Sequence, residues 1–334
     1  MQRTFSIIGL LIILLSVATI TEFAHAGTES DELIQELAAE KGYSAEDLRQ
    51  ILSTAKRSQL VIDSLNRPAE TVHTWKTYRP IFLKPSRIEQ GVAYWKKHQK
   101  TLEKAAETYG VAPEIIVAII GVETFYGKRP GTIAILDALY TQAYHYPKRA
   151  KFGRSQLKAF LQILMEEQIE PAMAVGSYAG AMGTPQFIPT SFLSFAVDFD
   201  GDNKRDIWGN DADVIGSVAN YFSKHQWRKG EAVAVKTKPL DQRHPLYVDS
   251  AQRAAKPDIT VSRIKQAEIP ADGLGNDNAL IKVIHLKGAE GSEFWLGLHN
   301  FYVITRYNHS NLYAMAVFQL SQEILTLKNQ MDKQ

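Results

Sequence analysis

The sequence has 334 residues, of which 45% are hydrophobic and 22% are charged, and its formal net charge is +2. This length and apolar content support a sizeable core in one to three domains. The small net charge differs from the strong basic excess of most nucleic-acid-binding proteins, so we expect no nucleic-acid partner. Cysteine is absent, which excludes disulfides and a lipid-modified N-terminal cysteine.

The N-terminus carries the three parts of a secretory signal peptide. Arg3 supplies a positive charge, residues 7–15 are an apolar run, and Ala24-His25-Ala26 fits a cleavage site. We therefore predict a signal peptide at 1–26, the alternative being an uncleaved membrane anchor, for which the run is short. Export without disulfides fits a Gram-negative periplasm. We expect a periplasmic monomer that is not a lipoprotein.

The N-terminal third of the mature chain is predicted to be helical. Apolar residues have helical spacing from residue 29 to about 75, with Ser44 as a plausible N-cap. The proline-rich stretch 78–85 should interrupt the helix. Amphipathic spacing then predicts a helix over 88–109, ended by Gly110. Three further helices are expected at 133–144, 155–168 and 215–227.

One helix in this region is apolar on every side. Pro113 occupies the favoured first helical position, and Glu114 follows near the positive end of the helix dipole. Residues 115–122 leave no polar face, so this helix should be buried at the centre of the domain. Gly127 is the expected residue that ends it.

The pattern changes at residue 231. Short β-prone runs at 232–235, 259–261 and 280–286 are separated by Pro, Asp and Gly clusters. Helical spacing returns at 301–305 and 312–327. We therefore predict an α+β fold that is mainly helical, with a helical region at 27–230, a β-rich inserted subdomain at 231–297, and C-terminal helices at 298–334 that complete the core.

Glu123 is the first candidate catalytic residue, because it lies near the C-terminus of the most apolar helix. Apolar surroundings raise the pKa of a carboxyl group, and the negative end of the helix dipole acts in the same direction. A glutamic acid that stays protonated near neutral pH can act as the general acid in glycosidic cleavage. The alternative is a glutamate that ends its helix facing solvent.

The segment 176–189 is rich in Gly and Ala, which permits a close approach of backbone to a ligand. Ser177 and Gln186 stand among aromatic residues there, a mixture that suits a polysaccharide cleft. A tight helix crossing that needs small residues is the alternative interpretation.

An acidic loop follows at 198–208. Carboxylates occupy its positions one, three, five and nine, and the carbonyl of Lys204 falls at position seven. Calcium prefers several oxygen ligands from one flexible loop. The loop differs from an EF-hand because its Gly is at position four and Gly209 is at position twelve, so that Asp211 or Asp213 would have to close it. We predict a structural calcium site, with a solvated acidic turn as the alternative.

Five segments in order resemble the membrane-bound lytic murein transglycosylase B family. They are GVETFYG around Glu123, GSYAGAMGTPQFIPTSF from Gly176, VDFDGDNKRDIW from Val197, IGSVANYF before Ser223, and FYVITRYNHSNLYAMAV from Phe301. The resemblance implies a lysozyme-like catalytic core with an N-terminal α region and a small β domain. The family's founding type is tethered by a lipidated cysteine, which this chain lacks, so a soluble periplasmic form is expected.

The resemblance also implies a reaction. Glu123 would be the sole acid/base: it would protonate the oxygen between N-acetylmuramic acid and N-acetylglucosamine, and then take the proton of the muramic C6 hydroxyl. That hydroxyl attacks C1 and yields a 1,6-anhydro product without hydrolysis. Neighbouring attack by the N-acetyl group removes the need for a second carboxylate, which ordinary glycosidases have. No catalytic cofactor is required. The partners implied are peptidoglycan strands and the cell-wall synthesis machinery.

Further site residues follow from the matched positions. The substrate-binding set implied is Tyr78, Ser177, Gln186, Tyr221, Asn308 and Tyr313. The implied calcium ligands are Asp198, Asp200, Asp202 and Asp213, beside the carbonyl of Lys204. Lys148 and Arg149 form a basic segment that the resemblance places toward peptide stems. A lysozyme-type hydrolase using the same glutamate and a non-catalytic glycan-binding scaffold remain the rival functions.

Overall fold

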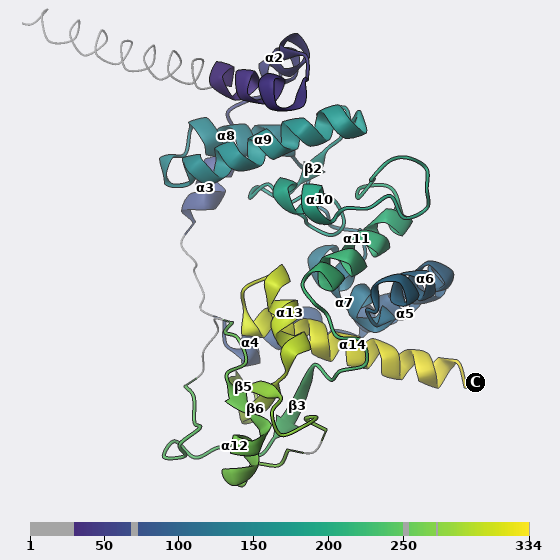
Figure 1. Cartoon of the computed structure of the whole chain (residues 1–334), viewed down its shortest axis with the longest axis vertical. Coiled ribbons are helices and arrows are strands. Elements are labelled where there is room, and N and C mark those ends of the chain that lie inside the picture. Colours follow the sequence, from purple (N-terminus) through teal and green to yellow (C-terminus); the bar gives the residue numbers. More distant parts are fainter. Residues whose placement is uncertain (1–29, 68–72, 250–253, 272, 334) are drawn as a thin grey trace, which may run out of the picture. The chain divides into compact units, whose positions relative to one another are not determined.

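The computed structural model describes residues 30–67, 73–249, 254–271 and 273–333 (Figure 1). The predicted signal peptide and its alternative, a membrane anchor, lie outside the described residues. The chain divides into two compact units. The first contains the N-terminal part up to Asn66 with Thr132–Ala181 and Ile188–Leu193, and the second contains Arg67–Gly131, Met182–Phe187 and Ser194–Gln334. Helices predominate and the sheets are small, which confirms the predicted fold class.

The first unit is built from helices. They are residues 30–41, α2 (Ala45–Ser53), α3 (Gln59–Asn66), α8 (Ile135–Tyr144) and α9 (Ala150–Glu167), with a 3-10 turn at Pro147–Arg149. Strands β1 (Ile133–Ala134) and β2 (Val175–Gly176) pair antiparallel, and α10 (Pro189–Phe195) begins in this unit and ends in the other. The Ser44 side chain accepts a hydrogen bond from the backbone of Asp47, so the predicted N-cap is confirmed. Leu33, Leu37 and Leu48 are fully buried.

The second unit contains α7 (Pro113–Thr124) and further helices. They are α4 (Trp75–Phe82), α5 (Pro85–Lys97), α6 (Gln99–Tyr109), α11 (Asp211–Lys224), α13 (His299–Tyr307) and α14 (Asn311–Met331). Helix α7 packs against α5, α6, α11 and α14, and its side chains from Ile116 to Ile120 have no exposed surface. The predicted central buried helix is therefore confirmed, including Pro113 at its first turn.

The predicted interruption in the proline-rich stretch 78–85 is observed at residues 83–84, between the end of α4 at Phe82 and the start of α5 at Pro85. Helix α4 nevertheless continues through Pro80, which removes one backbone donor from it. Two other local predictions in this unit were wrong. The helix predicted over 88–109 is two helices that meet at His98. Helix α7 ends before Gly127, because Phe125 and Tyr126 already have left-handed backbone angles, with φ of 54° and 60°.

A four-stranded antiparallel sheet lies within the segment that was expected to be β-rich. Its order is β3 (Ala234–Thr237), β6 (Gly291–Gly297), β5 (Leu280–Gly288) and β4 (Ile259–Thr260). The β5–β6 hairpin closes where Gly288 pairs with Gly291. Helix α12 (Val261–Gln266), which the sequence pattern did not predict, packs its buried Val261 and Ile264 into the core of this sheet. The boundaries 231–297 of a separate subdomain stay a prediction.

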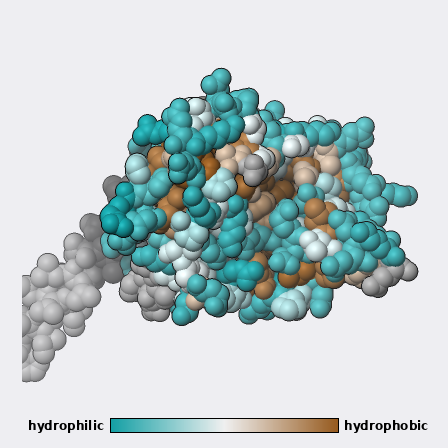
Figure 2. Space-filling view, turned by 90° about the horizontal axis from the view of Figure 1, so that it is seen from below, coloured by the Kyte–Doolittle hydropathy of each residue, from teal (hydrophilic) through white to brown (hydrophobic). Residues whose placement is uncertain are grey.

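Within the described residues no single helix is long and apolar enough to cross a membrane, whereas the bent pair α6 and α7, at 113°, meets that test together. The face in Figure 2 is mainly hydrophilic, and its hydrophobic residues lie in patches that are broken by hydrophilic ones.

Candidate active site

Glu123 lies in the last turn of α7, in the second unit. Burial raises the pKa of this carboxyl group from its ordinary value of 4.5 to about 7, and a hydrogen bond from Tyr313 lowers it by a smaller amount. The Tyr313 hydroxyl donates to Oε1 of Glu123 at 2.5 Å. The side chain nevertheless keeps part of its surface exposed. Glu123 can therefore hold a proton near neutral pH and present it to a ligand.

The end of α7 is fixed by Arg87 and Tyr126. The Arg87 Nη1 donates to the carbonyl of Gly121 at 2.8 Å, and the Tyr126 hydroxyl donates to the carbonyl of Arg87 at 2.8 Å. A Cβ atom at Gly91 or at Gly121 would lie 2.6 Å from that hydroxyl oxygen. The two glycines thus leave room for the Tyr126 ring between α5 and α7.

The backbone after Glu123 is strained. Phe125 and Tyr126 are non-glycine residues with positive φ, a conformation that costs about 1–3 kcal/mol at each residue. The Arg87 guanidinium lies 4.9 Å from the centre of the Phe125 ring, which supplies a compensating contact. The strained turn directs the chain away from α7 immediately after the carboxyl group.

Tyrosine side chains from three other helices surround Glu123. Tyr313 of α14 and Tyr307 of α13 are deeply packed, and Tyr78 lies on α4. Burial is the main cause that raises the pKa of all three hydroxyls, to about 12 for Tyr78, and the charge of Glu123 adds to it in each case. The site therefore combines one acid with neutral aromatic hydrogen-bonding groups.

The segment 182–187 is joined to the end of α7. The Thr124 hydroxyl donates to the carbonyl of Thr184 at 2.9 Å, and the Tyr307 hydroxyl donates to the carbonyl of Pro185 at 2.6 Å. Gln186 has a positive φ of 54°, and its Nε2 donates to the carbonyls of Pro130 and Gly183 at 2.9 and 2.8 Å. These hydrogen bonds hold the backbone of the segment beside the end of α7, and the close approach of this backbone to a ligand stays a prediction.

Gly183 explains why a small residue is needed in this segment. A Cβ atom there would lie 2.5 Å from the carbonyl oxygen of Ile207, and the φ of Gly183 is +60°. The backbone of Thr184 donates to the same carbonyl oxygen at 2.9 Å. The segment that carries Gln186 is therefore held between α7 and the end of the acidic loop.

The other predicted cleft residues fall in several places. The Tyr221 hydroxyl on α11 donates to the carbonyl of Arg306 at 2.7 Å, and its ring centroid lies 4.7 Å from that of Tyr307. Asn308 is exposed directly after α13. Ser177 belongs to the first unit, where its Oγ accepts from the backbone of Ala181 at 3.1 Å.

The basic segment also belongs to the first unit. Lys148 and Arg149 form part of the 3-10 turn before α9. Lys148 is exposed, and the Arg149 guanidinium lies 4.4 Å from the centre of the Phe152 ring.

The acidic loop has the geometry of a cation-binding turn. Carboxylate oxygens of Asp198, Asp200 and Asp202 lie within 4.8 Å of one another. Position six of the loop is Asn203, whose φ is 69°. Asparagine tolerates this left-handed conformation better than most residues, so it takes the place of the usual glycine. The donor set and the turn therefore fit calcium.

Asp213 connects the two ends of this loop. Its Oδ1 accepts from the backbone of Phe199 at 2.7 Å, and its Oδ2 accepts from the backbone of Asp206 at 2.8 Å. The side chain is fully buried at the start of α11. Its role as a closing calcium ligand stays a prediction.

Sequence reasoning missed Tyr307, Arg87 and Tyr126 as parts of the site. Tyr307 precedes Asn308 in a segment that had been singled out, so its position was a usable signal. Tyr126 likewise lies in the segment GVETFYG around Glu123. Arg87 gave no such signal, because its role depends on the packing of α5 against α7, which sequence spacing alone does not specify.

Known lytic transglycosylases are similar to this chain in sequence. The pattern of the transglycosylase SLT domain family matches residues 26–322. The membrane-bound lytic murein transglycosylase B of Escherichia coli (strain K12) is 39% identical over 305 residues, which cover 88% of this chain and 82% of the relative.

Solved structures are similar as well. Soluble lytic transglycosylase SltB1 from Pseudomonas aeruginosa is 42% identical, with a TM-score of 0.84 over 90% of this chain and 99% of the other. Escherichia coli lytic transglycosylase Slt35 in complex with calcium is 39% identical, with a TM-score of 0.79 over 90% and 93%. SltB3 from Pseudomonas aeruginosa in complex with NAG-anhNAM-pentapeptide is 29% identical, with a TM-score of 0.78 over 89% and 79%. The chain belongs to the transglycosylase SLT domain family.

Proposed function

We propose that this chain is a peptidoglycan lytic transglycosylase that cleaves the bond from N-acetylmuramic acid to N-acetylglucosamine. The observation that carries the proposal is Glu123, whose pKa is raised to about 7 among tyrosines at the end of a buried helix. Burial and Tyr313 account for this pKa shift, and no second carboxyl group of the described residues contributes to it. This setting supports one acid that works alone.

In the first half of the reaction Glu123 is the general acid. Its proton passes to the glycosidic oxygen, the bond from that oxygen to C1 breaks, and the N-acetyl oxygen of the muramic sugar attacks C1. The carboxylate that remains accepts the hydrogen bond from Tyr313 at 2.5 Å. This hydrogen bond favours the charged form of the carboxyl group and thereby stabilises the Glu123 carboxylate between the two halves of the reaction.

In the second half Glu123 is the general base. The carboxylate takes the proton of the muramic C6 hydroxyl, and O6 forms a bond to C1 while the N-acetyl oxygen leaves. Glu123 ends protonated, as it began, and no water is consumed. The attacking hydroxyl belongs to the substrate, so the step gains from proximity. Gln186, Tyr78, Tyr221 and Asn308, all in the second unit, are proposed to hold the glycan around this centre. Ser177, in the first unit, stays a predicted substrate-binding residue.

The acidic loop is proposed to bind a structural calcium ion. Asp198, Asp200 and Asp202 would be its carboxylate ligands, with the Lys204 carbonyl and Asp213 closing the site. A bound ion would neutralise three carboxylates that lie close together and would fix the start of α11. We further propose that the chain acts in the periplasm after export.

Product analysis tests the reaction. Murein digested by the purified protein is analysed by mass spectrometry, and 1,6-anhydro ends are expected, each lighter by one water than a reducing end. Reducing ends as the main product would contradict the transglycosylase and favour a lysozyme-type hydrolase. A folded wild type that binds murein without cleaving it would favour a glycan-binding scaffold.

A further inference from the structure

The second unit contains a cavity of about 1000 Å³ that Glu123 does not line. Its walls are the end of α11, the turn over residues 225–232, helix α13 and the loop over residues 273–280. The proposed reaction does not use these side chains. The cavity is large enough for a ligand of several residues.

Cations predominate among the described residues that line this cavity. The cationic residues of the lining are Lys224, Lys256, Arg228 and Arg306, whereas Glu231 is its one acidic residue. Arg228 and Glu231 form an ion pair at 3.3 Å and balance each other. Three cations remain without a balancing acid in the lining, so the cavity attracts anionic groups.

Arg306 is the cation that indicates a specific anion. Its guanidinium lies 4.4 Å from the centre of the Tyr302 ring, and Tyr302 lines the same cavity. Its Nη2 donates to the Thr305 hydroxyl at 3.5 Å, and its Nε is buried. A planar guanidinium is well suited to a carboxylate.

The wall that carries Arg228 is held rigidly to α13. Asn300, which is fully buried, accepts a hydrogen bond from the backbone of Arg228 at 2.9 Å and donates to the carbonyls of Arg228 and Glu231 at 2.8 and 2.9 Å. Nε2 of His299 forms a further hydrogen bond with the carbonyl of Gln226 at 2.8 Å. The cationic wall is thus preorganised, which reduces the entropic cost of binding.

The remaining lining has the character of a peptide-binding surface. Asn276 and Asn278 offer neutral amide groups, and Leu280, which is 48% exposed, offers apolar surface. Amide, apolar and cationic groups together match a peptide that bears free carboxylates.

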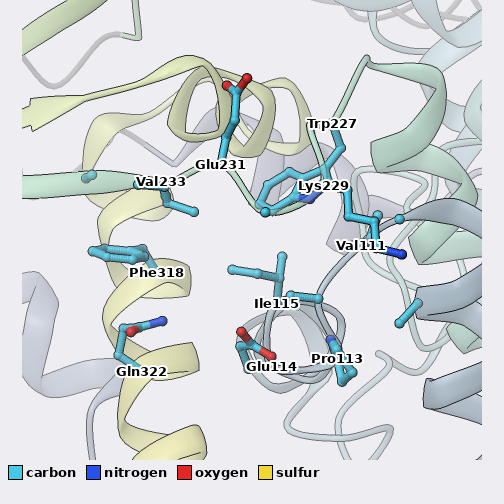
Figure 3. Close-up of a pocket in the computed structure, with 16 residues that line it drawn as sticks. Val111, Pro113, Glu114, Ile115, Trp227, Lys229, Glu231, Val233, Phe318 and Gln322 are labelled. Carbon is cyan, nitrogen blue, oxygen red and sulfur yellow. The ribbon is translucent and has the colours of Figure 1, made fainter. Parts of the chain in front are cut away.

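A neighbouring cavity provides a contrast (Figure 3). It has a volume of about 570 Å³, and Trp227, Phe318 and Ile115 form its apolar walls. Its charged residues are Glu114, Glu231 and Lys229, which carry no cationic excess. Lys229 therefore serves as a control for the lysine in the larger cavity.

We propose that the larger cavity binds the carboxylate-bearing peptide stem of peptidoglycan. This inference rests on the proposed function, because it takes murein as the ligand. The cavity is joined to the catalytic surroundings through α13: Arg306 lines the cavity, and the charge of Glu123 raises the pKa of the next residue, Tyr307, in addition to burial. The carbonyl of Arg306 also accepts from Tyr221. A bound stem would hold its glycan strand at the enzyme.

Isothermal titration with free stem peptides tests the proposal on the full wild-type chain. The probe is a synthetic stem peptide with free carboxylates, and its partner is the same peptide with amidated carboxylates. Neither contains a glycosidic bond, so Glu123 cannot cleave them. The wild type should bind the free acid about tenfold more tightly than the amide, because charge-assisted bonds to Arg306 and Lys224 would be lost.

Variants of the lining residues show where the stem peptide binds. Arg306→Gln and Lys224→Gln should each weaken binding of the free acid about tenfold, Arg306→Lys should restore part of it, and Lys229→Gln should bind as the wild type does. Circular dichroism verifies that each variant is folded.

Three results would overturn the proposal. They are equal affinities for the acid and the amide, a loss of binding in Lys148→Gln instead of Arg306→Gln, and equally strong competition by inorganic phosphate. Murein cleavage to anhydro products by a wild type that fails to bind the peptide would overturn only this inference, whereas absence of anhydro products would overturn the proposed function.

Discussion

At the scale of single residues, the site depends on how the pKa of Glu123 is set. Burial raises this pKa and the Tyr313 hydroxyl lowers it. The two opposing influences suit a group that must first release a proton and then recover one. A fully exposed glutamate would already be ionised at neutral pH, and one buried without a donor would release its proton less readily.

The pH dependence of cleavage follows from this balance. Because the general acid must be protonated, kcat/KM should fall as the pH rises through about 7, the pKa of Glu123. In Tyr313→Phe the bond that lowers the pKa is lost, so the alkaline limb should move to higher pH while the maximal rate falls. Rates of soluble product release between pH 5 and 9 measure the position of the alkaline limb and the maximal rate for the wild type and for Tyr313→Phe. A limb that stays in place in Tyr313→Phe would contradict this role of the tyrosine.

At the scale of elements, α7 positions the acid and its neighbours hold its end. The sequence predicted the buried helix and Glu123 at its C-terminal end, because an apolar run without a polar face can only be buried. It did not predict the left-handed turn at Phe125 and Tyr126, which depends on packing between helices distant in sequence. Helix α4 was missed for a similar reason: Trp75 is buried by tertiary contacts that proline spacing cannot reveal.

Gly121→Ala tests the contact between α5 and α7. The new Cβ would lie 2.6 Å from the Tyr126 hydroxyl oxygen, so we expect a loss of about 1–3 kcal/mol in the free energy of unfolding together with lower activity. Urea denaturation measures the loss. The exposed Glu107→Ala on α6 is the control and should change stability by less than about 0.5 kcal/mol. Wild-type stability in Gly121→Ala would show that Tyr126 can move aside.

The acidic loop gives a prediction about metal removal. If the folded chain alone binds calcium, free calcium at 100 times its Kd adds about 2.7 kcal/mol to the free energy of unfolding, so a chelator should lower Tm. Asp202→Asn should abolish the response to calcium, whereas Asp258→Asn, outside the loop, should retain it. Differential scanning calorimetry with calcium, magnesium or chelator measures the shifts. An unchanged Tm would leave the loop as a solvated acidic turn.

At the scale of the whole molecule, sequence and structure agree on the fold class. The sequence predicted a mainly helical chain with a late β-rich segment, and its motifs named the family. The cluster of Asp198, Asp200 and Asp202 was predicted because these carboxylates alternate along one short loop of the sequence. The larger cavity could not be predicted from a local motif, because its residues Lys224, Lys256 and Arg306 come from three distant segments of the sequence.

We propose that Glu123 alone performs both proton transfers. Glu123→Gln is nearly isosteric and cannot release or accept the proton, so anhydro product formation should fall by at least about a thousandfold, the scale of a lost general acid/base. The measurement is mass spectrometry of murein digests by wild type and Glu123→Gln, with binding of both to insoluble murein as the control for folding. We predict retained binding with no anhydro products above background. Anhydro products at the wild-type rate from Glu123→Gln would contradict the account and place the chemistry on another residue.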